Sequence, residues 1–234
     1  MGKIVITLIK PYQLLKGDTI GILSPSFVLK HEDIQPSLEK LKEKGFKIKI
    51  ANNAFKDTYG YAATPEERAE DFNGMIADND VKMLLFGGGE VCNEILPLLD
   101  FSLRRENPKI ICSYSDSTTL LNAIAVNSGV VTFYGQSLRT FLNITDYNYQ
   151  CFQSAFCSSD IPVYCSNSKW EIIREGKCEG ALIGGYLVDA EYERLKALGV
   201  EFVKLPKTHP WGSRSFWFRD LDGNIVDFVC VPTT

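Results

Sequence analysis

Histidine is the scarcest informative residue in this sequence, since His31 and His209 are the only two among 234 residues. Mechanisms that need two or three imidazoles, such as a three-histidine metal site, are therefore nearly excluded. Long apolar runs are missing as well. The run from Ile4 to Ile9 stops at Lys10, so it is too short for a signal-peptide core or a membrane span. We therefore expect a cytoplasmic protein with no membrane partner.

An excess of basic residues is also absent. The chain has 29 acidic and 25 basic residues and a formal net charge of -4. A dedicated nucleic-acid-binding protein would show a basic excess, so no nucleic-acid partner is expected. Cysteine is present seven times, an odd number, without any Cys-x-x-Cys pair. This pattern argues against a disulfide framework or a zinc knuckle and favours reduced, structural thiols.

The first part of the chain alternates strand patterns with helix patterns. Short β-branched or fully apolar runs predict strands at Thr19–Leu23, Phe46–Ile50, Val81–Phe86, Lys109–Cys112 and Val130–Tyr134. Helical spacing of apolar residues predicts helices around Ile34–Leu41, at Thr64–Ala77, from Glu90 onward and at Thr118–Asn127. This alternation predicts an α/β fold, a mostly parallel sheet with helices on both faces that binds ligands at the carboxyl ends of its strands.

The clearest helix start is Thr64. Its side chain can cap the helix, Pro65 needs no amide partner in the first turn, and Glu67 completes a capping box. The helix should run to about Ala77.

A glycine-rich loop, Gly87 to Glu90, follows the strand at Val81–Phe86. A backbone without Cβ atoms can approach a ligand closely and present free amides to an anion or an oxyanion. The loop lacks the spacing of a dinucleotide-binding or P-loop motif, so a simple tight turn is the alternative.

A second loop of interest, Ser113 to Ser117, lies between the strand Lys109–Cys112 and the next helix. A hydroxyl on a sharp strand-to-helix turn is typical of a nucleophile elbow, which needs small residues two before and two after the nucleophile. Ser113 and Ser117 occupy these positions around Ser115. The alternative is that Ser115, Asp116 and Ser117 only cap the helix.

An ordered set of motifs carries a family resemblance. They are Lys10-Pro11, Lys16 to Ile22, Ser24-Pro25-Ser26, the Gly87–Glu90 loop with Leu96 to Asp100, Tyr114 to Thr118, and Gly180 to Gly185. Over residues 8 to 187 the chain resembles the LD-carboxypeptidases of serine peptidase family S66, including the microcin C self-immunity branch.

The resemblance implies amide hydrolysis, either of a murein peptide of peptidoglycan or of a peptidyl-nucleotide such as microcin C, without a metal or organic cofactor. It implies that Ser115 is the nucleophile and that backbone amides near Gly88 and Asp116 form the oxyanion hole. Further substrate contacts are expected from Gly89, Glu90 and Ser24. It also favours a homodimer that acts on a small peptide or peptidyl-nucleotide substrate.

Two departures from the family pattern put turnover in question. Ser113 stands where the family usually has glycine, and nothing after Leu187 resembles the second domain that supplies the Glu and His of the triad. A serine without its base has little nucleophilicity. His209 is the only histidine after Ser115 and could act as a base only through a favourable fold. The alternatives to an active hydrolase are a catalytically impaired binding relative and a truncated or fused chimera.

The last residues resemble a different family. Leu198 to Phe202, Trp211 to Arg214 and Asp220 to Asn224 resemble the C-terminal module of the vicinal-oxygen-chelate superfamily, which includes glyoxalases and bleomycin-resistance proteins. A small α+β module with a βαβββ-like order is therefore expected. Asp227 occupies the position of a metal-binding Glu in that superfamily, but one carboxylate is too few for a site, so we expect no bound metal.

These patterns predict three segments. Residues 1–140 should form the LD-carboxypeptidase-like α/β domain, residues 141–187 a connecting segment that ends in the Gly-Gly motif, and residues 188–234 the glyoxalase-like half module. Phe216 and Phe218 are expected to pack against a helix at Tyr192 and Leu195. A metal-binding or small-molecule-binding module in this last segment is the third functional hypothesis.

Overall fold

The computed structural model describes residues 8–87, 92–160, 162, 166–169, 171, 175–176, 199–208, 214–219 and 225–230. The chain divides into two compact units, Met1–Gly184 and Gly185–Thr234, and each is described by itself. Within the described residues, no helix combines the length and the apolar character that a membrane crossing requires.

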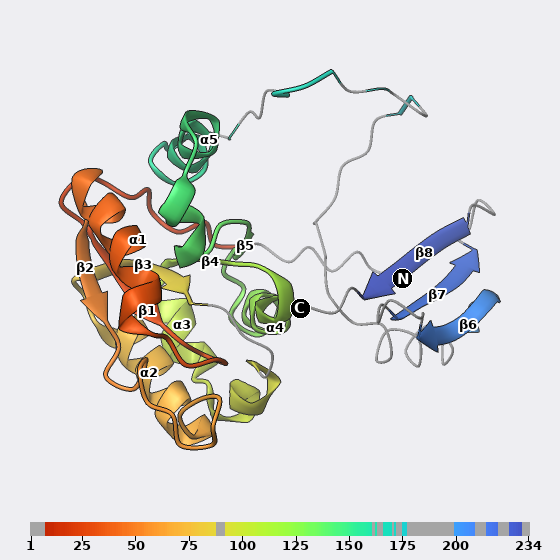
Figure 1. Cartoon of the computed structure of the whole chain (residues 1–234), viewed down its shortest axis with the longest axis horizontal. Coiled ribbons are helices and arrows are strands. Elements are labelled where there is room, and N and C mark those ends of the chain that lie inside the picture. The colour runs from red at the N-terminus through yellow and green to blue at the C-terminus, as the bar shows by residue number, and fades with distance from the viewer. Residues whose placement is uncertain are drawn as a thin grey trace. The chain divides into compact units, whose positions relative to one another are not determined.

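The first unit is built on a five-stranded sheet in the order β2-β1-β3-β4-β5 (Figure 1). The strands are β1 Thr19–Leu23, β2 Lys47–Ile50, β3 Val81–Phe86, β4 Ile110–Ser113 and β5 Phe133–Tyr134. All four neighbouring pairs are parallel, which confirms the predicted mostly parallel sheet. The chain passes from β1 to β2 on one side and continues through β3, β4 and β5 on the other. This reversal of strand order opens a ligand-binding position at the carboxyl ends of β1 and β3.

The helices of this unit largely follow the predicted spacing. The α-helices are α1 His31–Glu43, α2 Pro65–Ala77, α3 Phe101–Glu106, α4 Thr118–Ser128 and α5 Asp146–Phe156. Three 3-10 helices add η1 Cys92–Leu98, η2 Ser115–Ser117 and η3 Leu138–Asn143. The capping box at the start of α2 is present as predicted: the Thr64 hydroxyl accepts the Glu67 amide at 3.3 Å, and the Glu67 carboxylate accepts the Thr64 amide at 3.0 Å.

Two elements differ in detail from the prediction. The helix expected from Glu90 onward is, in its described part, the 3-10 helix η1 rather than an α-helix, and it contains Pro97. The strand predicted from Val130 is also shorter, since β5 begins at Phe133. Val130 itself forms an isolated parallel bridge with Ile9, so the first strand-like residues pair outside the main sheet.

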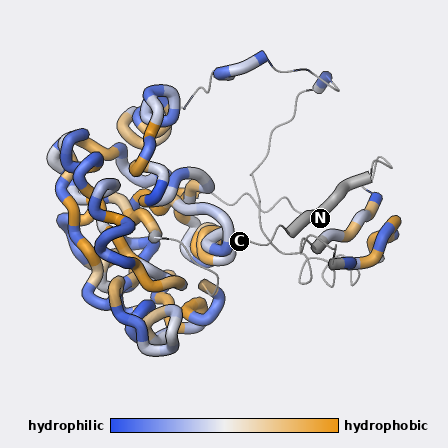
Figure 2. Tube along the Cα trace, in the orientation of Figure 1, coloured by the Kyte–Doolittle hydropathy of each residue, from blue (hydrophilic) through white to orange (hydrophobic). Residues whose placement is uncertain are grey.

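The core lies against the three central strands β1, β3 and β4, whose side chains are almost all buried, whereas the outer strands β2 and β5 are partly exposed. In β3 every residue except Lys82 is buried, which agrees with a strand that is covered on both faces. The hydropathy colouring in Figure 2 shows apolar segments along these strands, while the helices alternate between apolar and polar residues. Phe152 and Phe156 of α5 belong to the same core, although α5 lies in the segment that was predicted to be a connection.

The segment before β1 is held by residues far along the chain. The Ile9 amide donates to the Gly129 carbonyl at 2.7 Å, and the Leu14 amide donates to the Phe156 carbonyl at 2.6 Å. Leu14 is 1% exposed, so this contact lies in the core. The N-terminal segment is therefore closed onto the loop after α4 and onto the end of α5.

The second unit contains a three-stranded antiparallel sheet in the order β6-β7-β8, with β6 Phe202–Thr208, β7 Arg214–Arg219 and β8 Ile225–Cys230. Phe216 is fully buried, and its ring meets that of Phe202 edge-on with centroids 5.7 Å apart. The ammonium group of Lys204 lies 3.3 Å from the Trp217 ring centroid. The predicted helix with Tyr192 and Leu195 lies outside the described residues, so the expected packing of Phe216 and Phe218 against it stays a prediction.

Candidate functional site

The turns that follow β1, β3 and β4 meet at one edge of the sheet. The parallel register pairs Leu23 of β1 with Phe86 of β3, and Leu85 of β3 with Cys112 of β4. The three carboxyl ends therefore lie side by side. This edge carries the turn from Ser24 to Ser26, the glycine-rich loop and the turn that contains Ser115.

Ser115 adopts an unusual backbone conformation. Its φ of 59° lies in the left-handed region, and among the described residues it is the only one other than glycine with a positive φ. This conformation costs an L-residue roughly 1–2 kcal/mol, so the surrounding fold must hold it in place. Ser115 opens η2 directly after β4 and before α4, which is the strand-to-helix turn expected of a nucleophile elbow.

Ser113, which stands where the resemblance leads one to expect glycine, fits into this turn. It is 1% exposed, ends β4 and pairs with Tyr134 of β5. Its carbonyl accepts the amide of Gly135 at 2.9 Å. The serine side chain, which is larger than that of the expected glycine, is therefore buried at the end of β4. It does not prevent the left-handed conformation at Ser115.

The capping alternative for these residues finds little support. Ser117 is the N-cap of α4, but its side chain makes no capping hydrogen bond. The Asp116 carboxylate instead accepts the backbone amide of Cys92, at the start of η1, with an N to O distance of 2.8 Å. The Asp116 side chain therefore connects the Ser115 turn with the segment that follows the glycine loop.

The Cys92 thiol takes part in the same connection. It lies 3.7 Å from the Ser117 hydroxyl and also interacts with the Ser26 hydroxyl. Burial, together with the nearby Asp116 carboxylate, raises the pKa of Cys92 to about 12. The thiol is therefore neutral at physiological pH and serves as a buried polar contact rather than as a nucleophile.

Gly87 shows why glycine is required at the first position of the loop. A Cβ atom built on Gly87 would lie 2.0 Å from Cδ2 of Leu29, so a side chain at this position would displace Leu29. The Gly87 amide donates to the Leu23 carbonyl at 3.0 Å, which fixes this end of the loop to β1. The predicted site residues Gly88, Gly89 and Glu90 lie outside the described residues.

Ser24, the predicted substrate contact after β1, has an unsatisfied hydroxyl. The residue is 7% exposed, and its Oγ has no hydrogen-bond partner among the residues that the structure describes. Buried polar atoms are normally paired, so an unpaired hydroxyl at the carboxyl end of a central strand marks a position where a ligand atom could bind.

The turn that carries Ser24 is held by Arg68, which our sequence reasoning missed. Arg68 is 1% exposed and donates to the carbonyls of Pro25 and Ala63, each at 2.9 Å, and it forms an ion pair with Glu94 of η1. The spacing in the sequence could have indicated its burial, because Arg68 precedes the buried Phe72 by one helical turn and so falls on the inner face of α2. Arg68 therefore joins the Ser24 turn, the start of α2 and η1.

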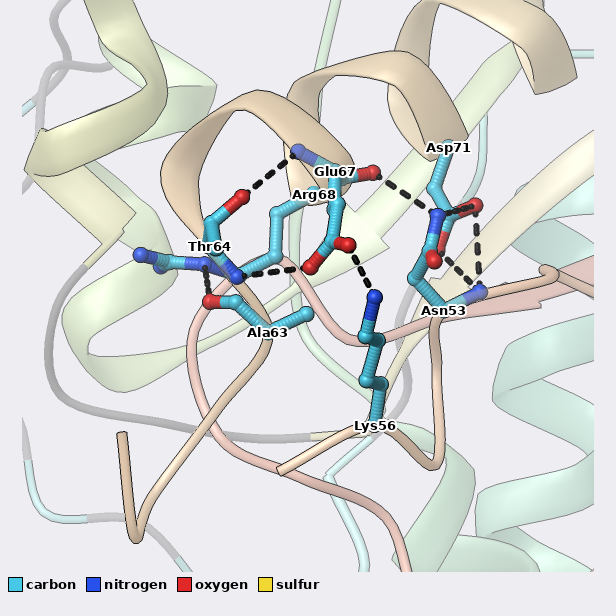
Figure 3. A network of polar contacts seen from close by, with 7 residues as sticks. All are labelled: Asn53, Lys56, Ala63, Thr64, Glu67, Arg68 and Asp71. Carbon is cyan, nitrogen blue, oxygen red and sulfur yellow. Dashed lines mark hydrogen bonds and ion pairs between the residues drawn. The ribbon is translucent and has the colours of Figure 1, made fainter. Parts of the chain in front are cut away.

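The loop after β2 is fastened to the same helix start (Figure 3). The Asp71 carboxylate accepts the Asn53 amide at 3.0 Å, and Lys56 forms an ion pair with Glu67. Desolvation raises the pKa of the Asp71 carboxyl group, while its hydrogen bonds with Asn53 oppose the shift. These contacts make the beginning of α2 a fixed support for the edge of the sheet.

The structure does not provide a base for Ser115 within its described part. There, the Ser115 hydroxyl has no imidazole or carboxylate partner, and His31 stacks on Phe55 with ring centroids 3.6 Å apart. His209 lies outside the described residues. Asp227 lies in β8 opposite Trp217, and the described side chains include no cluster of three or more metal-ligating groups.

Comparisons with known proteins agree with this geometry. Residues 20–135 match the family model of the LD-carboxypeptidase N-terminal domain, and residues 187–228 match the glyoxalase/bleomycin resistance protein/dioxygenase superfamily. The probable murein peptide carboxypeptidase of Bacillus subtilis is 35% identical over 183 residues, which cover 76% of this chain and 57% of that protein. The microcin C7 self-immunity protein MccF of Escherichia coli is 32% identical over 207 residues, which cover 74% of this chain and 60% of that protein.

Solved structures give the same result. The MccF-like protein of Bacillus anthracis superposes with a TM-score of 0.62 at 32% identity, covering 64% of this chain and 47% of that chain. MccF in complex with aspartyl sulfamoyl adenosine gives 0.61 at 33% identity, covering 64% and 48%. The chain thus spans less than two thirds of the length of these relatives. Within that span, residues 20–135 match the LD-carboxypeptidase N-terminal domain, and the parallel sheet of this segment is similar to that of the MccF structures.

Proposed function

We propose that the first unit binds a small peptide or peptidyl-nucleotide at the carboxyl edge of its sheet and cleaves an amide bond with Ser115 as the nucleophile. The observation that carries this proposal is the left-handed Ser115 at the turn between β4 and α4. Strain of this kind is kept where a side chain must be presented at a defined angle. The relatives that match this region are named as a murein peptide carboxypeptidase and as a microcin C7 self-immunity protein, which supports both substrate classes.

In the proposed reaction the Ser115 oxygen attacks the amide carbonyl carbon, and backbone amides donate hydrogen bonds to the oxyanion of the tetrahedral intermediate. The C–N bond then breaks, the amine leaves with the proton taken from Ser115, and water hydrolyses the acyl-serine to release the acid. The amides of Gly88 and Asp116 are our candidates for these donors, because two fixed donors are needed close to the attacking oxygen. Ser24 is the candidate for a further substrate contact, since its buried hydroxyl has no partner. A base must also remove the proton of Ser115, and none stands beside it in the described part of the chain.

The proposal is tested with a fluorophosphonate probe, which reacts with activated serine nucleophiles. We expect the wild-type chain to be labelled and Ser115→Ala to remain unlabelled. Ser102→Ala is the matched control, because it removes an exposed hydroxyl that only contacts Asp100 at the start of α3. An unlabelled wild-type chain, or equal labelling of Ser115→Ala, would reject Ser115 as an activated nucleophile.

Binding without turnover is the second candidate function, and it is favoured by the buried Ser24 hydroxyl, which has no hydrogen-bond partner among the described residues. Calorimetry with a murein tetrapeptide and with aspartyl sulfamoyl adenosine measures binding, and chromatography of the peptide after one day detects product. Saturable binding without product supports the binding relative. Absence of binding to both compounds would count against it.

The second unit carries a separate proposal, which rests on its antiparallel sheet and on the glyoxalase-superfamily match at residues 187–228. We infer that this half module pairs with the module of a second copy, in a homodimer, and that the paired sheets take up a metal ion or small molecule. Elemental analysis and sedimentation of the purified protein test this idea. A monomer without stoichiometric divalent metal would reject it.

A further inference from the structure

The carboxylate of Asp116 makes a contact that is separate from the proposed role of the Asp116 backbone amide as an oxyanion donor. This carboxylate accepts the Cys92 amide at 2.8 Å. Cys92 is fully buried, so its amide has no access to water and depends on a protein acceptor. A carboxylate that accepts a backbone amide forms a charge-assisted hydrogen bond, which is stronger than a bond between neutral groups.

Cys92 is the first described residue after the glycine-rich loop, so its hydrogen bond with Asp116 acts close to that loop. The segment 88–91, which contains most of the glycine-rich loop, has Gly87 before it and Cys92 after it. Gly87 is tied to β1 through the Leu23 carbonyl at 3.0 Å, and Cys92 is tied to the Ser115 turn through Asp116. The two described residues that flank the segment 88–91 are therefore both held: Gly87 by the end of β1, and Cys92 by the turn after β4.

A second contact acts between the same turns. The Cys92 thiol lies 3.7 Å from the Ser117 hydroxyl, and it also interacts with Ser26 in the turn after β1. Asp116 and Ser117 thus hold the backbone and the side chain of one buried residue. Because two independent contacts converge on Cys92, the turn after β4 and the start of η1 should move together as one rigid unit.

We propose that Asp116 is a positioning residue, whose carboxylate fixes Cys92, at the start of η1, relative to Ser115. The inference rests on the proposed hydrolase function and adds to it. The two candidate oxyanion donors come from different loops, and the Asp116 carboxylate joins the turn that carries Ser115 to the first described residue after the glycine-rich loop. A misplacement of about 1 Å in such a site can lower a rate about 100-fold.

The experiment combines hydrogen exchange with labelling of Ser115. Deuterium exchange at the Cys92 amide reports the contact directly, and the rate of fluorophosphonate labelling reports its consequence. In Asp116→Ala we expect exchange at Cys92 to be about tenfold faster or more, and labelling to be about tenfold to 100-fold slower. Asp116→Asn keeps an acceptor oxygen, so it should restore most of the protection and most of the labelling rate.

Asp100→Ala is the matched control. The Asp100 carboxylate accepts the Leu103 amide at 2.9 Å at the start of α3 and also accepts hydrogen bonds from Ser102, so this variant loses carboxylate hydrogen bonds and one charge away from the proposed site. Its exchange should increase at the start of α3 and not at Cys92, and its labelling rate should equal that of the wild-type chain. Far-UV circular dichroism shows whether each variant is folded.

Either of two results would overturn the positioning role of Asp116 without rejecting the proposed hydrolase. One is unchanged exchange at Cys92 in folded Asp116→Ala, and the other is faster exchange with an unchanged labelling rate. An Asp116→Asn variant as impaired as Asp116→Ala would also contradict the acceptor role. An unlabelled wild-type chain is a different outcome, because it rejects the proposed hydrolase and the positioning role together.

Discussion

Replacement of Arg68 by methionine is the sharpest test of how the edge of the sheet is supported. Methionine fills similar space with a flexible apolar chain but donates no hydrogen bond. Arg68→Met would remove the hydrogen bonds that Arg68 donates to the carbonyls of Pro25 and Ala63, and it would leave Glu94 without its ion pair but still accepting from the Tyr61 hydroxyl at 3.3 Å.

The expected loss follows from the burial of these groups. Hydrogen bonds from a charged donor contribute about 1.5–3 kcal/mol each, and two of them join Arg68 to buried carbonyls. The variant no longer pays the free-energy cost of burying a charged guanidinium, and this gain offsets part of the lost hydrogen-bond energy. The Glu94 side chain is 33% exposed and can return to water, so its share is small. We therefore expect Arg68→Met to lower the free energy of unfolding by about 3 kcal/mol, and Glu94→Gln by about 1 kcal/mol or less.

Urea titration followed by circular dichroism at 222 nm measures this loss. The described α-helices all lie between residues 31 and 156, so unfolding of the first unit contributes directly to this signal. A loss below 1 kcal/mol in Arg68→Met would refute the reasoning. Equal losses in Arg68→Met and Glu94→Gln would also refute it, because the ion pair and not the two carbonyls would then dominate.

Three further predictions concern stability, each measured by the same titration. Gly87→Ala should cost about 1–3 kcal/mol because its Cβ would lie 2.0 Å from Leu29, and Leu29→Ala should reduce that additional cost; independent, additive losses would contradict the clash. Burial lowers the pKa of Lys109 to about 8 from 10.5, so the folded state releases this proton first and stability should rise by about 1 kcal/mol between pH 8 and 9. Lys109→Met should abolish that rise, and a rise that persists would assign it to another group. Ser115→Gly should be about 1 kcal/mol more stable than Ser115→Ala, because only glycine adopts a φ of 59° without strain, and equal stabilities would remove the strain argument.

Local sequence patterns predicted the secondary structure correctly where a short stretch of residues determines that structure by itself. Thr64, Pro65 and Glu67 carry all the chemistry of a helix start, and α2 runs from Pro65 to Ala77 as predicted. The apolar run Val81–Phe86 likewise became a central strand. In both cases the signal and the structure lie within one segment.

Prediction failed where the deciding contact comes from another segment. The apolar spacing after Glu90 resembles a helix, but its described part is the 3-10 helix η1, which contains Pro97 and begins at Cys92, the residue that Asp116 anchors. Arg68 was missed because a charged side chain is ordinarily assigned to the solvent face, and the carbonyls that receive it lie in other segments. The small residues around Ser115 indicated a sharp turn, yet its left-handed backbone depends on the packed turn between β4 and α4. The predicted roles of Gly88, Gly89, Glu90 and His209 remain predictions.

The bonds from Ile9 to Gly129 and from Leu14 to Phe156 also bear on how the chain is made. During synthesis the N-terminal segment leaves the ribosome long before its partners exist, so the Ile9 amide stays in water until Gly129 has emerged, and the Leu14 amide until α5 has emerged. From that moment the first unit has its strands, its core aromatics and its closing contacts, whatever follows along the chain. A nascent chain arrested after α5 should therefore already resist proteolysis, whereas one arrested after β5 should be cut before β1.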